Sequence, residues 1–245
     1  MKTALVTGGQ QGIGLGIATA LAAAGYRVVL AAEAAPDSAA VGAALAAMPG
    51  ARYLRHDLLT DAPKALLDQV GPLDCHVSNA GVPAKARGDM LDVTADSLDF
   101  VMGVNLRGAF FLAQEVARRM LAAPSPHYRS MLFVTSVSAG MVSVERAEYC
   151  LSKSAAAMMA QLFAVRLAPH GIGVFDLRPG IIETGMTAGV RDIYTARIKA
   201  GLVPAARWGL PADIGAVAVP LAEGQMAFAT GAVIPVDGGL SIGRL

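Results

Sequence analysis

Two side chains that can take part in proton transfer lie four positions apart in the stretch "AEYCLSKSAA", residues 147–156. A free phenol has a pKa of about 10 and is a poor proton-transfer group at neutral pH. A nearby ammonium group favours the phenolate, and Lys153 would lie one helical turn after Tyr149 on the same helix face. The pair is therefore either ordinary exposed helix surface or an activated acid/base.

A second candidate site is the glycine-rich stretch "TGGQQGIG", residues 7–14. Gly8 permits a tight turn, Gly12 lets the backbone come close to a ligand, and Gly14 lets a following helix pack on the sheet. The free N–H groups at the start of that helix would face a phosphate. A tight turn without a ligand is the alternative. The place of the loop between a first strand and a first helix favours nucleotide binding.

Alternating elements must position these residues. Aliphatic or β-branched runs predict strands at 3–7, 27–31, 51–55, 74–78, 130–136, 172–178 and 232–237. Helical patterns lie between them, such as those at 14–25, 61–71, 110–122 and 152–171. This alternation predicts an α/β fold with a doubly wound parallel sheet of about seven strands and helices on both faces. Ligands of such sheets bind beyond the carboxyl ends of the strands.

Composition excludes several classes of protein. The net charge of +1 and the 16% of charged residues give no strong field for nucleic acid or acidic lipid. No apolar run reaches the length of about 18 residues that a membrane span needs. Cys75 and Cys150 are far apart and form no CxxC, so we expect free thiols in a cytoplasmic protein and no metal site. The hydrophobic content of 54% also suits helix faces buried between subunits.

The glycine loop resembles the cofactor loop T-G-x-x-x-G-[IL]-G of the short-chain dehydrogenase/reductase family. Further matches are "NAG" at 79–81, Asn105 in "GVNLRGAFF", Ser136 thirteen residues before Tyr149, "PGIIET" at 179–184 and "ATGAVIPVDGGLS" at 229–241. The resemblance covers essentially the whole chain. It implies a single Rossmann domain over residues 1–245 and an enzyme that transfers a hydride between a nicotinamide cofactor and a carbonyl/secondary-alcohol pair.

The same resemblance implies roles for four residues. Tyr149 would exchange a proton with the substrate oxygen, and Ser136 would donate a hydrogen bond to that oxygen. Lys153 would favour the phenolate and bind the nicotinamide ribose, while Asn105 would hold a water that links Lys153 to solvent. Ser138 competes with Ser136 for its role, and the thirteen-residue spacing favours Ser136.

Cofactor contacts follow from the matched motifs. They are Gly8, Gln10, Gln11, Gly12, Ile13 and Gly14 in the first loop, Ala32, Glu33, Asp57, Leu58, Asn79, Ala80 and Gly81 around the adenosine, and Tyr149, Lys153, Pro179, Gly180, Ile182 and Thr184 near the nicotinamide. NAD-preferring relatives end the second strand with aspartate, where this chain has Ala32. Glu33 would repel a 2′-phosphate and can accept hydrogen bonds from ribose hydroxyls. We therefore expect NAD, with NADP as the alternative and a solvent-facing Glu33 as the competing interpretation.

The substrate side is expected around a variable lid at about 185–209. Met186 and Trp208 either face an apolar substrate or pack against their own scaffold. Ser138, Met141 and Val142 are further candidate wall residues. Arg146 either meets an anionic substrate or forms an exposed ion pair with Glu145 or another neighbour.

Three other functions compete with an NAD-dependent dehydrogenase. The segment from residue 146 onward resembles NADPH-dependent 3-oxoacyl-[acyl-carrier-protein] reductases. A nucleotide-binding regulator would not need the proton-relay residues, and lyases or epimerases of this fold usually have longer chains. We expect a small-molecule substrate, no nucleic-acid or membrane partner, and a homotetramer in which the helices at 110–122 and 152–168 pair across a two-fold axis.

Overall fold

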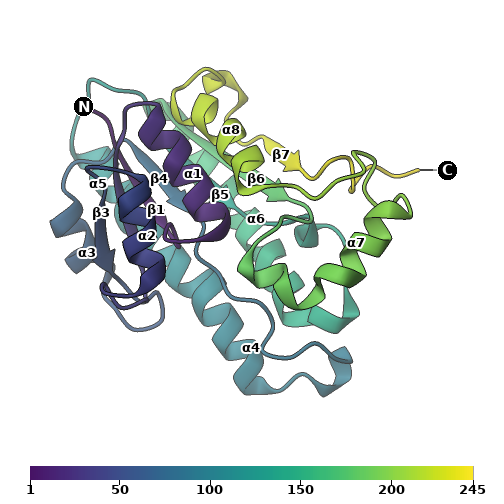
Figure 1. Cartoon of the computed structure of the whole chain (residues 1–245). Helices are drawn as coiled ribbons and strands as arrows, with labels where there is room; N and C mark the ends of the chain where they lie inside the picture. The colour runs from purple at the N-terminus through teal and green to yellow at the C-terminus, as the bar shows by residue number, and fades with distance from the viewer. Residues whose placement is uncertain (245) are drawn as a thin grey trace.

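A single parallel sheet forms the centre of the computed structural model, which describes residues 1–244 (Figure 1). Its strands lie in the order β3-β2-β1-β4-β5-β6-β7, and every neighbouring pair is parallel. The strands are β1 Thr3–Thr7, β2 Arg27–Ala32, β3 Arg52–Arg55, β4 Cys75–Ser78, β5 Arg129–Val134, β6 Ile172–Pro179 and β7 Val233–Val236. The predicted doubly wound parallel sheet is confirmed.

Helices cover both faces of the sheet and explain why its strands are apolar throughout. Helices α1 (Gly12–Ala23), α2 (Ala39–Ala47) and α8 (Pro211–Ala222) share one core with alternate strand residues. Helices α3 (Pro63–Val70), α5 (Ala109–Ala122) and α6 (Ala147–Leu167) share the other. Every residue of β1 is buried between these layers. Burial of apolar area on both sides is the main contribution that holds the layers together.

Helix α6 begins earlier than the predicted range of 152–171. It starts at Ala147 and ends at Leu167, so that Tyr149 and Lys153 lie in its first two turns. The α-helix ends before Pro169, which has no N–H group for the carbonyl oxygen four residues earlier, and a short 3₁₀ turn Ala168–His170 leads to Gly171 in the left-handed conformation. Strand β5 likewise ends at Val134, which leaves Ser136 in the loop that follows rather than in the predicted strand at 130–136.

Helix α4 (Ala95–Met102) runs into α5 through a wide π-helical turn at Gly103–Gly108. A Cβ atom at Gly108 would lie 2.1 Å from the carbonyl oxygen of Leu58, and one at Gly103 would lie 2.6 Å from Cδ2 of Leu59. The loop after β3 therefore lies directly against the turn, at a separation that admits only glycine.

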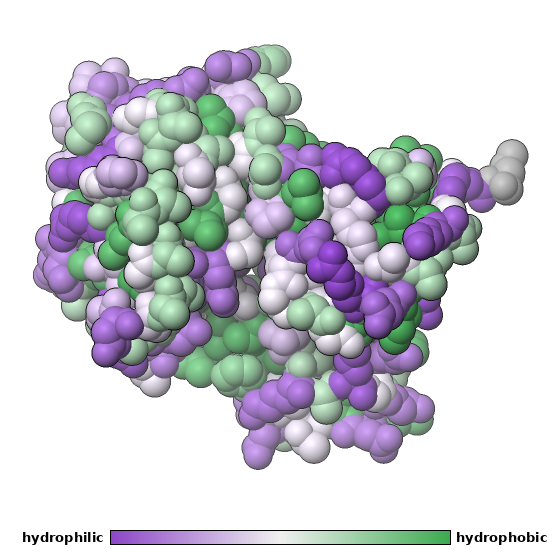
Figure 2. Space-filling model, in the orientation of Figure 1, coloured by the Kyte–Doolittle hydropathy of each residue, from purple (hydrophilic) through white to green (hydrophobic). Residues whose placement is uncertain are grey.

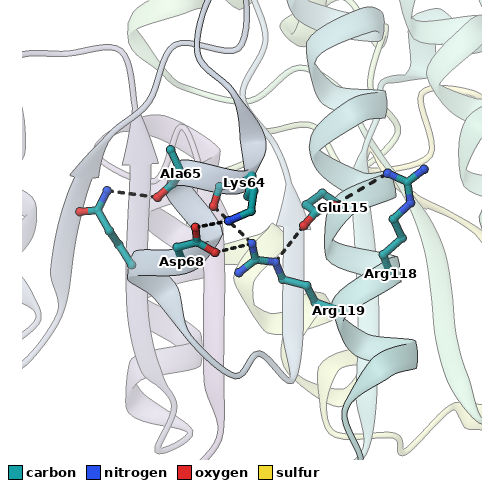
Figure 3. Close-up of polar contacts among 7 residues, drawn as sticks. Lys64, Ala65, Asp68, Glu115, Arg118 and Arg119 are labelled. Carbon is teal, nitrogen blue, oxygen red and sulfur yellow. Dashed lines mark hydrogen bonds and ion pairs between the residues drawn. The ribbon is translucent and has the colours of Figure 1, made fainter.

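A chain of ion pairs joins α3 to α5 on the surface (Figure 3). Asp68 accepts hydrogen bonds from Lys64 Nζ at 2.8 Å and from Arg119 Nη2 at 2.7 Å. Arg119 also contacts Glu115, at 3.0 Å. The hydrogen bonds from Lys64 and then Arg119 lower the pKa of Asp68. Exposed pairs of this kind contribute little each, so the network mainly fixes the angle between the two helices.

Strand β4 carries two titratable side chains into the core. Cys75 and His76 have no exposed surface, and they point to opposite faces of the sheet. Burial raises the pKa of the Cys75 thiol to about 12 and lowers the pKa of His76 to about 4. Both groups are therefore neutral at physiological pH.

No helix within residues 1–244 combines the length and apolar character that a membrane crossing requires.

Candidate active site

The predicted site residues gather beyond the carboxyl ends of β1, β4, β5 and β6, next to the point where the strand order reverses between β1 and β4. Open α/β sheets bind ligands in this crevice. Figure 2 shows a hollow here, between the body that contains the N-terminal strands and the lobe that contains α7 (Arg191–Lys199).

The glycine loop has the backbone geometry of a phosphate cradle. Gly8 and Gly12 have φ angles of +63° and +54°, values that favour glycine. A Cβ atom at Gly14 would lie 2.2 Å from the carbonyl oxygen of Gly8, so only glycine fits there. Gln11 precedes α1 without capping it through its side chain, which leaves the first N–H groups of the helix to a ligand.

One further feature of this loop fits a nucleotide. Gln10 is buried, and within residues 1–244 its Oε1 atom has no hydrogen-bond partner. A buried polar atom of this kind normally has a partner, so it marks a place where a ligand or water completes the network. Ile13, the second residue of α1, is partly buried beside the core.

Thr7 links the glycine loop to the loop after β4, a role that the sequence reasoning missed. Its Oγ1 accepts hydrogen bonds from the N–H groups of Asn79 at 2.9 Å and Ala80 at 3.0 Å. Asn79 in turn donates its side-chain amide to the carbonyl oxygen of Thr7 at 2.9 Å. A hydroxyl residue at the end of the strand before a glycine loop is the signal that could have identified it.

The residues predicted to line the adenosine lie at the ends of β2 and β3. Ala32 is buried, and its carbonyl oxygen accepts hydrogen bonds from Tyr53 Oη and the N–H group of His56, both at 2.8 Å. Glu33 follows Ala32 and is exposed. The pKa of Tyr53 is raised mainly by its own burial and secondly by the negative charge of Glu33. Asp57 accepts the N–H group of Leu59 at 2.8 Å, and Leu58 packs beside the core. Ala32 and Glu33 are thus held at the rim of the crevice.

Tyr149 and Lys153 lie on one face of α6, and Lys153 Nζ is 5.7 Å from the centre of the tyrosine ring. Lys153 is buried and donates a hydrogen bond to the carbonyl oxygen of Val134 at 3.0 Å. A Cβ atom at Gly81 would lie 3.6 Å from the same nitrogen, which places the "NAG" loop beside it. The structure therefore brings the predicted phenol, ammonium and ribose-binding loop together.

Ser136 lies in the turn between β5 and α6, and its Oγ accepts the N–H group of Ser138 at 3.0 Å. The Ser136 hydroxyl is left with its proton to donate. Beneath it, the neighbouring Thr135 donates to the buried carboxylate of Asp176, which also pairs with Arg178 at 2.9 Å. Sequence reasoning missed this support because it joins β5 to β6 across the sheet.

The side chain of Asn105, in the π-helical turn, makes three hydrogen bonds within the protein. Its Oδ1 accepts the N–H group of Val82 at 2.7 Å, and its Nδ2 donates to the carbonyl oxygen of Val82 at 2.9 Å and to Ser152 Oγ at 3.0 Å. Asn105 thus ties the loop after β4 to α6, one residue before Lys153.

The predicted nicotinamide loop follows β6. Pro179 ends the strand, Gly180 packs against Asp237, and Ile182 is buried. Thr184 lies at the start of a short helical turn, and its methyl group would be 3.4 Å from a Cβ atom at Gly12. The loop after β6 therefore lies against the glycine loop, although the two are far apart in the sequence.

Candidate substrate residues divide into three groups. Trp208 donates to Thr195 Oγ1 at 3.1 Å and packs edge-on against Tyr194, as expected for packing on its own scaffold. Met141, Val142 and Met186 are exposed. Ser138 is buried, and Arg146 lies between it and Tyr149, with no ion pair to Glu145 or any other acid of residues 1–244. In the same residues, no three His, Cys, Asp or Glu side chains are grouped as a metal site.

Comparison with known proteins identifies the family. The family model described as "Enoyl-(Acyl carrier protein) reductase" matches residues 8–241. 3-Oxoacyl-[acyl-carrier-protein] reductase MabA of Mycobacterium bovis is 33% identical, over 99% of this chain and 94% of that protein.

Solved structures agree with this match. A 3-oxoacyl-[acyl-carrier protein] reductase from Brucella melitensis in complex with NAD has a TM-score of 0.93 and 45% identity, with 100% of this chain and 98% of the other covered. A putative 2-deoxy-D-gluconate 3-dehydrogenase from Agrobacterium tumefaciens with bound NADP has a TM-score of 0.86 and 34% identity, with 98% and 96% covered. The chain belongs to the short-chain dehydrogenase/reductase family of NAD(P)-dependent oxidoreductases.

Proposed function

We propose that the protein is an NAD-preferring oxidoreductase in which Tyr149 exchanges a proton with the oxygen of a ketone or secondary alcohol. The observation that carries this assignment is the position of Tyr149 and Lys153 on one face of α6, 5.7 Å apart from ring centre to Nζ. The phenol oxygen would exchange the proton with the alcohol, and the buried Lys153 would lie beside it during the transfer.

Ser136 would hold the substrate oxygen, and Lys153 and Asn105 would link Tyr149 to solvent for proton exchange. Ser136 donates its remaining hydroxyl proton to the substrate oxygen, where negative charge develops as the carbonyl is reduced. Lys153 connects Tyr149 to the interior of the site. Because the side chain of Asn105 is occupied by Val82 and Ser152, a water held by Asn105 would bind its main-chain carbonyl oxygen in the widened turn.

The residues present fit a nicotinamide dinucleotide. The close packing of Gly14 on Gly8 would bring the free N–H groups at the start of α1 to the pyrophosphate. The unpartnered Oε1 of Gln10 is an acceptor and would suit a ribose hydroxyl or a water. Glu33, Asp57 and the loop from Asn79 to Gly81 would hold the adenosine half. The loop from Pro179 to Thr184 would orient the ring that supplies or accepts the hydride.

A preference for NAD rests on the charges at the end of β2. Glu33 is exposed at the position where a 2′-phosphate would lie, and neither it nor Ala32 offers a positive charge. The register pairs Ala32 with Arg55, whose guanidinium lies 4.0 Å from Asp61. The relative from Brucella melitensis, in complex with NAD, supports the same preference.

Thermal unfolding with each nucleotide tests this preference. At a concentration about a hundredfold above Kd, a nucleotide that binds only the native state stabilises it by about 2.7 kcal/mol. We expect a shift with NADH, a much smaller shift with NADPH, and a smaller difference between the two in Glu33→Gln. Asp37→Asn, an exposed acid of the same loop, is the matched control. A larger shift with NADPH that disappears in Arg55→Ala would instead support an NADPH-dependent reductase.

A 3-oxoacyl-[acyl-carrier-protein] reductase is the second candidate, and the names of the relatives from Mycobacterium bovis and Brucella melitensis favour it. Activity with a 3-oxoacyl thioester and NADPH that exceeds every activity with NAD would decide for it.

A variable lid over the substrate is proposed for residues 185–209. Its second half is anchored, because Ile198 and Val203 are buried with Leu240. Its first half, which includes Met186 and Ile193, is exposed over the crevice.

The proposed assembly is a homotetramer built on α5 and α6. Their outer faces expose Phe111, Met158, Leu162 and Val165, the last with 79% of its surface accessible. Exposed large apolar side chains on two helices suit contact with another subunit.

Sedimentation equilibrium is expected to give the mass of four chains of 25.0 kDa. Leu162→Asp places a charge in the proposed contact and should lower that mass, whereas Arg52→Asp, at the edge strand β3, should not. The mass of one chain for the unaltered protein would refute the assembly.

A cytoplasmic location is proposed from the thiols. Neither Cys75 nor Cys150 forms a disulfide, and Cys75 is fully buried. Free thiols are typical of reducing compartments.

A further inference from the structure

Arg146 is a charged residue of the crevice that the proposed proton transfer does not use. It ends the short helical turn Val144–Arg146 and lies directly before α6. Its guanidinium carbon is 5.6 Å from the centre of the Tyr149 ring. Tyr149 therefore lies between two cations, Lys153 on the interior side and Arg146 on the side of the substrate residues.

The guanidinium has only weak contacts with neutral groups. Its Nη2 atom is 3.5 Å from Ser138 Oγ, and its Nε atom is 3.4 Å from Ser143 Oγ. No carboxylate oxygen of residues 1–244 lies within 4 Å of it, so the ion pair with Glu145 that the sequence allowed is not formed. Most of its five donors are thus left without a protein acceptor.

Arg178, on the other side of the same loop, differs from Arg146 because it has an acidic partner. Its Nη1 atom would lie 3.7 Å from a Cβ atom at Gly140, yet its charge is balanced by the buried carboxylate of Asp176 at 2.9 Å. A partly buried arginine normally has such a counter-charge, because desolvation of an unpaired charge costs free energy. At Arg146 the protein supplies none.

We propose that Arg146 and Ser138 bind the carboxylate of the substrate, so that the enzyme acts on a short hydroxy acid and the corresponding oxo acid. This inference rests on the proposed function. The planar guanidinium offers paired N–H donors that match the two oxygens of a carboxylate, and Ser138 adds a hydroxyl donor. Because the guanidinium of Arg146 lies 5.6 Å from the centre of the ring whose hydroxyl exchanges the proton, the carboxylate and the reacting carbon should be only a few bonds apart.

The reaction balances with the groups already named. In the oxidative direction the carbinol C–H bond breaks, and the hydride with its electron pair passes to the oxidised nicotinamide. The O–H proton passes to the oxygen of Tyr149, and the C–O single bond becomes a carbonyl. The carboxylate is unchanged and serves only to position the carbinol carbon.

A binding experiment tests the inference without knowledge of the natural substrate. Thermal unfolding of the full chain is followed with saturating NADH and, in addition, acetate, butyrate, lactate or 3-hydroxybutyrate, each compared with its own amide at equal ionic strength. We expect further stabilisation by at least one acid and none by its amide. In Arg146→Met the acid should bind at least about tenfold more weakly, since a charge-assisted pair is lost, and Arg146→Lys should recover part of the loss.

Arg52→Met, at the amino end of β3 and the opposite edge of the sheet, is the matched control and should bind the acid like the unaltered protein. Equal effects of acids and amides, or acid binding that persists in Arg146→Met, would overturn the inference. Absence of any shift with NADH would contradict the proposed function instead, so the two failures are distinguishable.

Discussion

Replacement of Tyr149 by phenylalanine is expected to lower kcat by about 10²–10⁴-fold, the range by which a positioned general acid/base accelerates proton transfer. The substitution removes one hydroxyl group and keeps the ring. The contacts of the ring with Arg146 and Lys153, at 5.6 and 5.7 Å, do not depend on that hydroxyl. The fold and the nucleotide site should therefore be retained, and only the proton-transfer step should be lost.

The measurement is the steady-state rate of NADH formation or consumption, together with the thermal shift that NADH produces. Gln161→Ala, at an exposed position farther along the same helix, is the matched control and should retain full activity. A Tyr149→Phe enzyme within a fewfold of the unaltered rate would show that another group supplies the proton. Loss of the NADH shift in the same variant would show that the substitution damages the cofactor site.

The second large effect is expected in the pH dependence of stability, through His76. Burial lowers the pKa of His76 from 6.5 to about 4 in the folded protein, whereas the unfolded chain has the ordinary value. Between these values the unfolded state binds a proton that the folded state does not. The contribution of His76 to the free energy of unfolding is therefore intact above pH 6.5 and falls by about 3 kcal/mol as the pH decreases to about 4.

Urea unfolding at a series of pH values measures this contribution. We expect His76→Leu to lose less stability than the unaltered protein between pH 7 and pH 4, whatever its stability at pH 7. His170→Leu, at an exposed position, should follow the unaltered protein. Parallel curves for His76→Leu and the unaltered protein would show that the folded state accommodates the charged ring.

Much of the fold could be predicted because the strands are buried on both faces. The run "TALVT" became β1, with every residue buried, and the order of runs along the chain gave the alternation of strands and helices. The start of α6 could not be predicted from the pattern of apolar residues. Arg146 precedes the helix without capping it, and the polar residues Glu148 and Tyr149 give the first turn no apolar period.

The site shows a similar division between local and distant information. The spacing of Tyr149 and Lys153 and the glycine pattern are local, and the structure brings them together. The contacts of Asn105 with Val82 and Ser152 span 23 and 47 residues, and they depend on how α4, α5 and α6 pack. The π-helical turn that carries Asn105 was not predicted, because its shape depends on the loop after β3 that presses against it.

That contact restricts how chimaeras between relatives can be built. The carbonyl oxygen of Leu58 occupies the space that a side chain at Gly108 would need, and Leu58 belongs to the loop that also carries Asp57. A crossover placed between these two segments would join a loop from one parent to a helix shaped for another. Exchange of the adenosine-binding half should therefore cut the chain after Gly108, so that both segments come from the same parent.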